Sequence, residues 1–200
     1  MTRVAFTGHI AGFGSGAGVR FVVGVWQDSP FGSFADVMVQ TADDTRLLLA
    51  PSAEVAEFIS ATYSFDDVQI VPVTARLQPD QLSVTAADLE LSVGLGGPAP
   101  VDWLLRWVPG FLATAPRWLR VIDPIASRMV PGVHTAGSAG NGRREFYGVR
   151  RSRRITGLSG QFRGTSLGGL AALSPPVAFG FSSAPPAPQL VSVTTTIDLP

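Results

Sequence analysis

Residues 68–95 read VQIVPVTARLQPDQLSVTAADLELSVGL, and this stretch predicts three consecutive strands joined by short turns. The first strand is expected at Val68–Leu77. Apolar and polar residues then alternate over Leu82–Ala86 and Leu89–Leu95, a pattern typical of strands with one buried face. Pro79 stands at the second position of the turn before Leu82. Strands connected by such short links pair antiparallel, so the stretch predicts a meander.

Further strand-like segments lie on both sides of this meander. They are predicted at Arg3–Ile10, Val19–Trp26, Phe34–Gln40, Arg46–Ala50, Arg144–Arg150, Arg154–Arg163, Val177–Phe181 and Leu190–Leu199. One helix is expected over residues 52–62, where Ser52 can cap its first turn. The strands do not alternate with helices. The expected fold is therefore mainly β (α+β): an antiparallel sheet curved into a closed or partly open barrel, with one central helix and a cluster of short helices.

The chain is interpreted as one domain, residues 1–200. A strand-rich half at 1–95 contains the helix. Prolines break residues 101–131 into short predicted helices, and a second strand-rich half follows at 144–199. In this order of elements the chain resembles the calycin-type barrels, meaning lipocalin-like binding proteins and acetoacetate decarboxylase-like enzymes. The resemblance implies a barrel around a small ligand. Decarboxylases of that kind depend on a Schiff-base lysine, and the chain has no lysine.

The charges are segregated along the chain. Residues 1–100 carry 4 arginines against 11 acidic residues, and residues 101–200 carry 11 arginines against 4. Guanidinium groups suit carboxylate and phosphate oxygens, so Arg143, Arg144 and Arg150 are predicted to bind the anionic head of a small apolar ligand. The alternative is that this cluster pairs with the acidic first half of the same chain.

Several functions are excluded or disfavoured by the residues present. Without cysteine or lysine there is no thiolate nucleophile, disulfide, iron–sulfur cluster or Schiff base. The two histidines, His9 and His134, lack metal-ligand spacing, so neither a metal nor another cofactor is predicted. Nucleic acid is not an expected partner, because no known binding motif is present. The N-terminus lacks a signal-peptide pattern, and no membrane-spanning helix is predicted, so a cytoplasmic location is expected.

Two glycine-rich motifs are set aside. Residues 12–18 resemble a phosphate-binding loop, but a strand and not a helix is predicted after them, which favours a hairpin loop. Residues 164–168 match G-x-S-x-G around Ser166, but both histidines precede this serine. A hydrolase nucleophile there would need a histidine later in the chain.

Four residues are candidates for acid–base chemistry: Asp36, His134, Glu145 and Tyr147. Strand alternation places Asp36 on one face with Phe34 and Met38. If the opposite face packs outward, Asp36 points into the barrel, where burial would raise its pKa. The alternative is a structural carboxylate paired with an arginine or the backbone.

Two tryptophans one helical turn apart, Trp103 and Trp107, are predicted to form a lid over the ligand or an interfacial membrane segment. Simple core packing is the alternative. Three functions therefore remain: binding of a small apolar ligand with an anionic head, a cofactor-independent lyase- or isomerase-like enzyme, and transient contact with a membrane surface. The oligomeric state stays open.

Overall fold

Most of the chain is in β-strands. The structure is a computed structural model, and it describes residues 2–105, 136–138, 142–180 and 184–199. Its strands are β1 (Thr2–Ser15), β2 (Arg20–Asp28), β3 (Phe34–Gln40), β4 (Arg46–Ala50), β5 (Asp67–Ile70), β6 (Val73–Leu77), β7 (Gln81–Ala86), β8 (Leu89–Pro98), β9 (Ala136–Ser138), β10 (Arg144–Phe162), β11 (Thr165–Ser166), β12 (Leu170–Ala171) and β13 (Gln189–Leu199). The described residues also form two helices, α1 (Ala53–Ser60) and α2 (Asp102–Leu105).

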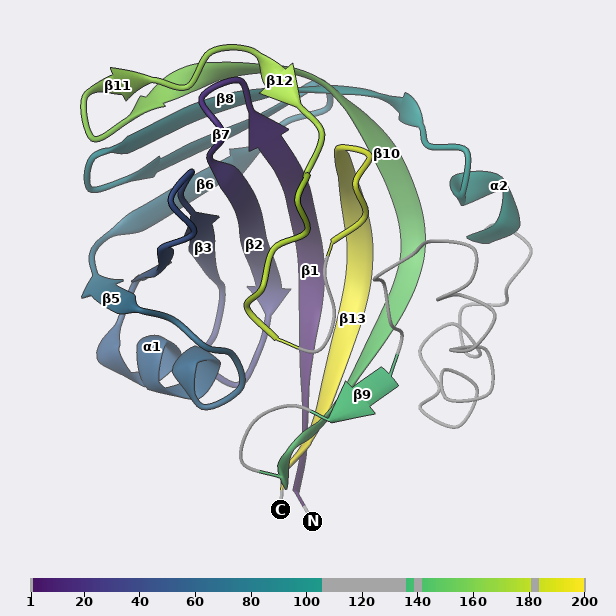
Figure 1. Cartoon of the computed structure of the whole chain (residues 1–200). Helices are drawn as coiled ribbons and strands as arrows, with labels where there is room; N and C mark the ends of the chain where they lie inside the picture. Colours follow the sequence, from purple (N-terminus) through teal and green to yellow (C-terminus); the bar gives the residue numbers. More distant parts are fainter. Residues whose placement is uncertain (1, 106–135, 139–141, 181–183, 200) are drawn as a thin grey trace.

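The long strands make one continuous sheet. Their order is β5-β4-β3-β2-β1-β13-β10-β8-β7-β6, and the short strands β9, β11 and β12 pair along β10 and β1 (Figure 1). Pairing along this path is antiparallel except between β4 and β5. The predicted mainly β fold with a curved antiparallel sheet is confirmed.

The sheet curls strongly into a half-barrel because one long strand belongs to both of its walls. The first part of β10 pairs with β13, and the second part pairs with β8. Its register shifts between Val149 and Arg151 and again on either side of Ile155, and such bulges bend a strand. The two edge strands, β5 and β6, are separated in the chain only by Val71 and Pro72. A two-residue link can join the two edge strands only if they lie close together in space. The sheet must therefore curl far enough to bring its two edges near each other.

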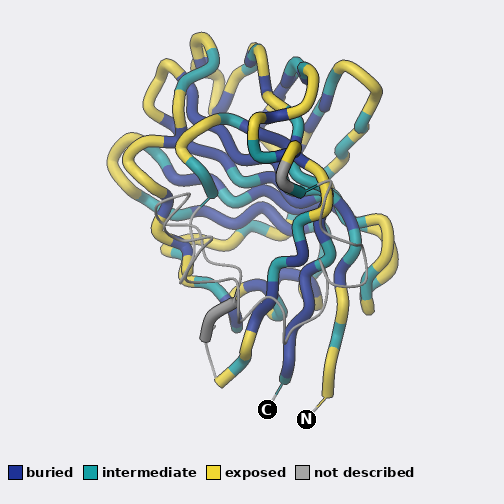
Figure 2. Tube along the Cα trace, turned by 90° about the vertical axis from the view of Figure 1, so that its right-hand side faces the viewer, coloured by how far each residue is buried: buried dark blue, intermediate teal, exposed yellow. Residues whose placement is uncertain are grey.

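The space inside the curl is filled by the main hydrophobic core. Phe13 and Phe21 from one wall and Leu82 and Val93 from the other are completely buried in it. Figure 2 shows the buried stretches running through the middle of the strands, with exposed turns at their ends. We call the side of the sheet that carries this core the inner face and the opposite side the outer face.

The outer face of β3 and β4 is covered by helix α1. Ser52 caps the helix by accepting a hydrogen bond from the amide of Val55, as the sequence predicted. The buried side of α1, with Val55 and Ile59, packs on Leu48 and Ala50 of β4. Leu47 and Leu49 point the other way into the inner core. The outer face thus has a core of its own, and this second core shapes the candidate site.

One predicted strand in the first half is divided in the structure. The predicted strand Val68–Leu77 is divided at Val71 and Pro72 into β5 and β6. Since α1 connects β4 to β5, the chain crosses over and β5 returns parallel to β4. This pair is the parallel exception in the otherwise antiparallel order of the described strands.

The second half differs from the prediction in other ways. Arg144–Arg150 and Arg154–Arg163 belong to the single strand β10, and Ser152 lies within it instead of in a turn. Residues 177–180 of the predicted strand Val177–Phe181 are not in a strand. They lie across the outer face, where side-chain burial and not sheet pairing holds them. Of the short helices expected over 101–131, α2 is found, and residues 106–131 lie outside the described residues.

Candidate functional site

A buried carboxyl group lies beside a pair of tyrosine hydroxyls on the outer face. The hydroxyl of Tyr63 donates a hydrogen bond of 2.6 Å to Oε1 of Glu145. The same hydroxyl lies 2.6 Å from the hydroxyl of Tyr147. Glu145 is 1% exposed. We call these three residues the tyrosine–glutamate group.

Strand geometry and the end of a helix bring the group together. Glu145 and Tyr147 are two residues apart on β10, so their side chains lie on the same face. Tyr63 follows α1, and its amide bonds to the carbonyl of Ile59 at the end of that helix. This turn holds the ring of Tyr63 over the outer face. The chain contains two tyrosines against twelve phenylalanines, and both tyrosines belong to the group.

Burial sets the acidity of the group. It raises the pKa of Glu145 from 4.5 to about 7, while hydrogen bonds from Tyr63 and Tyr147 and the charge of Arg143 act in the opposite direction. The pKa values of both tyrosines lie well above 10, because burial and the nearby Glu145 charge disfavour a phenolate. Near neutral pH the carboxyl can therefore both give and take a proton, whereas the phenols stay protonated.

Two polar atoms beside the group have no hydrogen-bond partner among the described residues. They are Oε2 of Glu145 and Oγ1 of Thr195. Thr195 of β13 pairs directly with Tyr147 on one side and with Phe6 of β1 on the other. Residues paired in this way share a face of the sheet, so the side chain of Thr195 lies on the outer face next to that of Tyr147. Buried polar atoms normally have partners, so the place suits a molecule with its own donor or acceptor.

An aromatic cluster adjoins the polar group. Phe6 contacts Trp26, Phe31, Phe34 and Phe58, with ring centroids 5.3–6.4 Å apart. Phe58 belongs to α1, so the cluster fills the space between the helix and the sheet. An apolar wall next to a few convergent polar atoms is the usual composition of a small-molecule site.

Arg143, one of the predicted ligand-binding residues, contacts the end of α1 next to this site. Arg143 donates hydrogen bonds of 2.9 Å to the carbonyl of Phe58 and 2.8 Å to Oγ1 of Thr62, and its guanidinium lies 4.6 Å from the Phe58 ring centroid. These contacts neutralise the carboxyl end of α1, which has no basic residue in its last turn. Arg143 thereby fixes the end of the helix that positions Tyr63.

A strap of chain, Leu173–Gly180, lies over the outer face beside Tyr63. Its side chains Leu173, Val177 and Phe179 are buried against Tyr63 and neighbouring residues. A Cβ at Gly180 would lie only 2.8 Å from the ring of Tyr63, so the strap passes close to that ring. The strap therefore packs directly on one member of the tyrosine–glutamate group.

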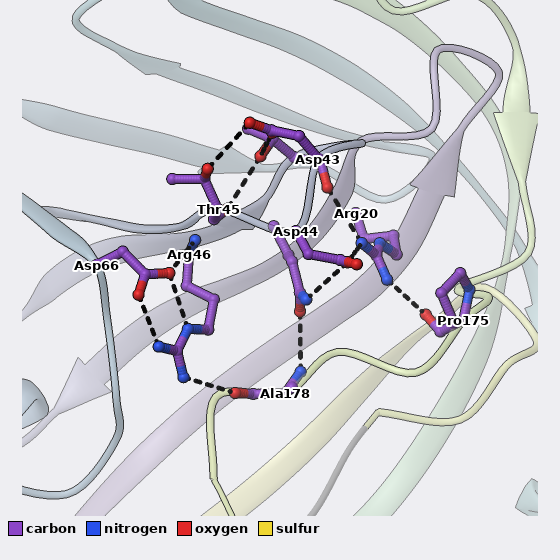
Figure 3. A network of polar contacts seen from close by, with 10 residues as sticks. Arg20, Asp43, Asp44, Thr45, Arg46, Asp66, Pro175 and Ala178 are labelled. Atoms are coloured by element: carbon purple, nitrogen blue, oxygen red, sulfur yellow. Dashed lines mark hydrogen bonds and ion pairs between the residues drawn. The ribbon is translucent and has the colours of Figure 1, made fainter.

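Polar side chains from the sheet hold the strap in place (Figure 3). Arg20 donates to the carbonyl of Pro175 at 3.1 Å, and the amide of Ala178 donates to Gln40 at 2.8 Å. Arg46, which is paired with Asp66 at 2.7 Å, also reaches the carbonyl of Ala178. Three side chains, one each from β2, β3 and β4, therefore hold the strap by hydrogen bonds to its backbone.

Asp36 is a separate buried carboxyl on the same face. It is 2% exposed and accepts a 2.9 Å hydrogen bond from the indole of Trp26. Burial raises its pKa to about 6, against the opposing effect of that hydrogen bond. The strands β2, β1 and β13 lie between its strand and β10, so it is not part of the tyrosine–glutamate group.

The condition under which Asp36 was expected inside the barrel is not met. Val37 and Val39, the small β-branched side of β3, face the inner core. Valines from the facing walls pack closely there, whereas the larger Phe34 and Met38 fill the space under α1. Asp36 therefore lies on the outer face, although its predicted burial and raised pKa are found.

The remaining predicted residues are dispersed. Arg144 and Arg150 are exposed, and Trp103 of α2 is 68% exposed. Trp107 and His134 lie outside the described residues. Of the arginine cluster, Arg151 pairs at 3.7 Å with Asp102, which belongs to the second half of the chain.

The glycine-rich motifs act as turns and close contacts. Residues 12–15 belong to β1, and the turn to β2 follows them, so the expected hairpin is present but shorter. Ser166 is exposed, and its Oγ accepts a hydrogen bond from the amide of Gly168. No group of three or more potential metal ligands is found within the described part of the chain. Among the described helices, none has the length and hydropathy needed to cross a membrane.

Sequence reasoning missed Tyr63 and Thr195. Tyr63 follows the predicted helix without a motif, and Thr195 lies in an ordinary strand. The sequence does contain one signal, because tyrosine is rare in this chain. A phenol hydroxyl that is buried usually has a hydrogen-bond partner, so the two tyrosines were candidates for a polar site.

The fold and the site together describe a mainly β half-barrel with a buried acid–base group on its outer face. No model of a known protein family matches the sequence, and no curated protein matches it. Among solved structures, the fold is similar to that of acetoacetate decarboxylase from Legionella pneumophila, at 11% sequence identity and a TM-score of 0.41. The match covers 98% of this chain and 82% of that chain. At this level the similarity extends no further than the course of the chain.

Proposed function

We propose that this protein binds a small, largely apolar molecule whose oxygen-bearing head lies at the tyrosine–glutamate group. The observation that carries the proposal is a pair of buried oxygens without partners among the described residues, Glu145 Oε2 and Thr195 Oγ1, on the face that carries the two phenols. A ligand oxygen would satisfy these atoms, and the aromatic cluster around Phe6 would receive the apolar body.

The head group can be an acid or a neutral oxygen group. The sequence suggested an anion held by several arginines, and among the described residues Arg143 is the arginine that acts on Glu145. A carboxylate next to Glu145 is favourable when one proton is shared between the two carboxyls. The raised pKa of Glu145 keeps that proton available up to about pH 7.

Binding of decanoic acid and decan-1-ol, measured by native mass spectrometry and thermal shift, tests the proposal. We expect Glu145→Gln and Tyr63→Phe to weaken binding at least about tenfold, because each removes a polar partner of the head. The exposed Glu90→Gln is the matched control and should bind as the unchanged protein does. Decanoic acid should bind more weakly above pH 7, and decan-1-ol should change less. No binding of either compound would overturn the proposal.

Acid–base catalysis is the second function that the same group favours. A carboxylate at Glu145 would remove a proton from the carbon next to a ligand carbonyl, and the electron pair of that C–H bond would move to the carbonyl oxygen as an enolate. The hydroxyl of Tyr63 or Tyr147 would donate a hydrogen bond to that oxygen. Returning the proton to another carbon gives an isomerase-like reaction, which needs no cofactor.

Deuterium exchange tests this second function. Small ketones incubated with the protein in D2O should lose their α-proton signals in NMR spectra. Glu145→Gln should abolish the enhancement, and Tyr63→Phe or Tyr147→Phe should reduce it by about 10- to 1000-fold, the usual cost of losing an oxyanion donor. Exchange that is no faster than in buffer, with ketones shown to bind, would leave binding as the function.

A further inference from the structure

The inner face carries a second polar group at the edge of its packed core. His9 of β1 pairs with Val25 of β2 on one side and with Ser192 of β13 on the other. Ala11, two residues further along β1 on the same face, is completely buried in the inner core. His9 is only half-buried. The polar residues therefore begin where the core side chains end.

Hydroxyl groups continue this polar row. Thr7 of β1 pairs with Thr194 of β13, and their Oγ1 atoms are 3.5 Å apart. Thr194 pairs in turn with Gly148 of β10. Residues paired across antiparallel strands share a face, so Thr7, Thr194, His9 and Ser192 lie together on the inner face.

One cation at the bulge beside this row has no partner among the residues that the structure describes. Arg150 is the additional residue of the β-bulge between Val149 and Arg151. It is exposed and makes no hydrogen bond or ion pair with the described residues. Arg151, the next residue of the bulge, pairs with Ser192 of β13, and Ser192 pairs with His9, so the bulge lies across β13 from His9. Burial and the charge of Arg150 both lower the pKa of His9. Within the described part of the chain, Arg150 is thus available to bind an anion near His9.

The nearby carboxylates are already engaged. Asp102 accepts a hydrogen bond of 2.9 Å from the amide of Ser152 and pairs with Arg151. Asp198 is held by Arg3 through two hydrogen bonds of 2.6 and 3.0 Å. Neither carboxylate pairs with Arg150, so the local charge at the bulge stays positive among the described residues.

The imidazole of His9 carries a hydrogen-bond donor. The side-chain amide of Gln27 lies 3.1 Å from its Nδ1, and an amide nitrogen can only donate. Nδ1 is therefore the acceptor, and in the neutral ring the proton is on Nε2. Hydroxyls, an imidazole N–H and a guanidinium are all groups that bind oxyanions.

We propose that His9, Thr7, Thr194 and Arg150 form a binding site for a small oxyanion, a carboxylate or a phosphate group. The site lies on the opposite face of the sheet from Glu145, so it stands or falls independently of the function proposed above. An anion there would neutralise the charge of Arg150 and accept hydrogen bonds from His9 and the threonines.

NMR titration of the histidines tests this site. The chain has two histidines, and a His134→Gln variant assigns the His9 signal. Inorganic phosphate, added at constant ionic strength against sodium chloride, should raise the pKa of His9 by about 0.5–1 unit and reach saturation. Acetate is the second probe. A shift with both probes assigns a general oxyanion site, and a shift with phosphate alone assigns a phosphate site.

Two arginine variants make the test specific. Arg150→Gln should itself raise the pKa of His9 and should remove the saturable effect of phosphate. Arg154→Gln, an equal change of charge at another exposed residue of β10, should keep that effect. Thr194→Val should weaken phosphate binding without changing the effect of chloride. The proposal is overturned if neither probe shifts His9, if chloride has the same effect, or if Arg150→Gln still shows saturation.

Discussion

The hydroxyl of Tyr63 donates a 2.6 Å hydrogen bond to Oε1 of Glu145, although the two residues are 82 positions apart in the sequence. The bond joins the end of α1 to the strand shared by both walls of the half-barrel. It occurs where Glu145 is almost completely removed from water. The contact thus gives the carboxyl a structural partner while burial keeps its pKa raised.

Glu145→Gln should flatten the dependence of stability on pH. The pKa of Glu145 rises from 4.5 in the unfolded chain to about 7 in the folded one, so the folded state binds more protons between these values. Stability from this group is fully present below about pH 4.5 and is lost as the pH rises to 7. The loss is about 3 kcal/mol in total. Urea denaturation at several pH values measures it.

The variant should be more stable than the unchanged protein at pH 8 and similar to it at pH 4.5. The exposed Glu90→Gln is the control, and it should leave the slope unchanged. Equal slopes for Glu145→Gln and the unchanged protein would contradict the raised pKa.

Trp26→Phe should raise the pKa of Asp36 above about 6. The indole N–H donates to Asp36 and favours the charged carboxylate, so its removal leaves burial unopposed. Carboxyl ¹³C chemical shifts followed over pH 4–9 measure the change. Phe34→Leu, a neighbouring aromatic change without a hydrogen bond to Asp36, serves as control. A lower pKa in Trp26→Phe would show that the indole does not stabilise the charge.

Gln40→Ala should loosen the strap. The carboxamide oxygen of Gln40 accepts from the amide of Ala178, and its loss leaves that amide without this partner. We expect a loss of about 1–3 kcal/mol in stability and faster hydrogen exchange at Ala178 and Phe179. Gln161→Ala, which removes an exposed bond to Glu90, should cost little. Unchanged hydrogen exchange at Ala178 would show that Arg20 and Arg46 are sufficient to hold the strap on the sheet.

Gly160→Ala should destabilise the fold by more than about 2 kcal/mol. Gly160 has a φ of +152°, and an added Cβ would lie 2.0 Å from the carbonyl oxygen of Glu90 on β8. Gly157→Ala is the matched control on the same strand, since a Cβ there meets nothing within 4 Å. Thermal and urea unfolding compare the two. Similar losses in both variants would mean that β8 and β10 separate easily at Gly160.

The local part of the fold could be predicted well from the sequence. Alternation in Leu82–Ala86 and Leu89–Leu95 located β7 and β8, and Ser52 with its apolar spacing located α1. The continuity of the strands was less predictable. The charged residues 150–154 suggest a break between two strands, yet β10 continues through them with a β-bulge. A strand tolerates such residues when neighbouring strands supply its backbone hydrogen bonds.

The candidate site could be predicted only in part. Glu145 and Tyr147 are neighbours on one strand, so their shared face follows from alternation alone. Which face is buried does not follow from alternation. Asp36 shows the difficulty, because both faces of β3 are apolar and only packing against β7, β8 and α1 decides between them.

The sequence by itself determined the mainly β fold, the place of the helix, the absence of thiol and lysine chemistry, and a carboxylate and a phenol on one strand. These properties depend on local spacing and composition. The tertiary structure alone decided that Tyr63 meets Glu145, that Arg143 supports α1, and that the bulge at Arg150 lies across β13 from His9. Such meetings depend on how far the sheet curls and where the chain crosses it, and no short stretch of sequence contains that information.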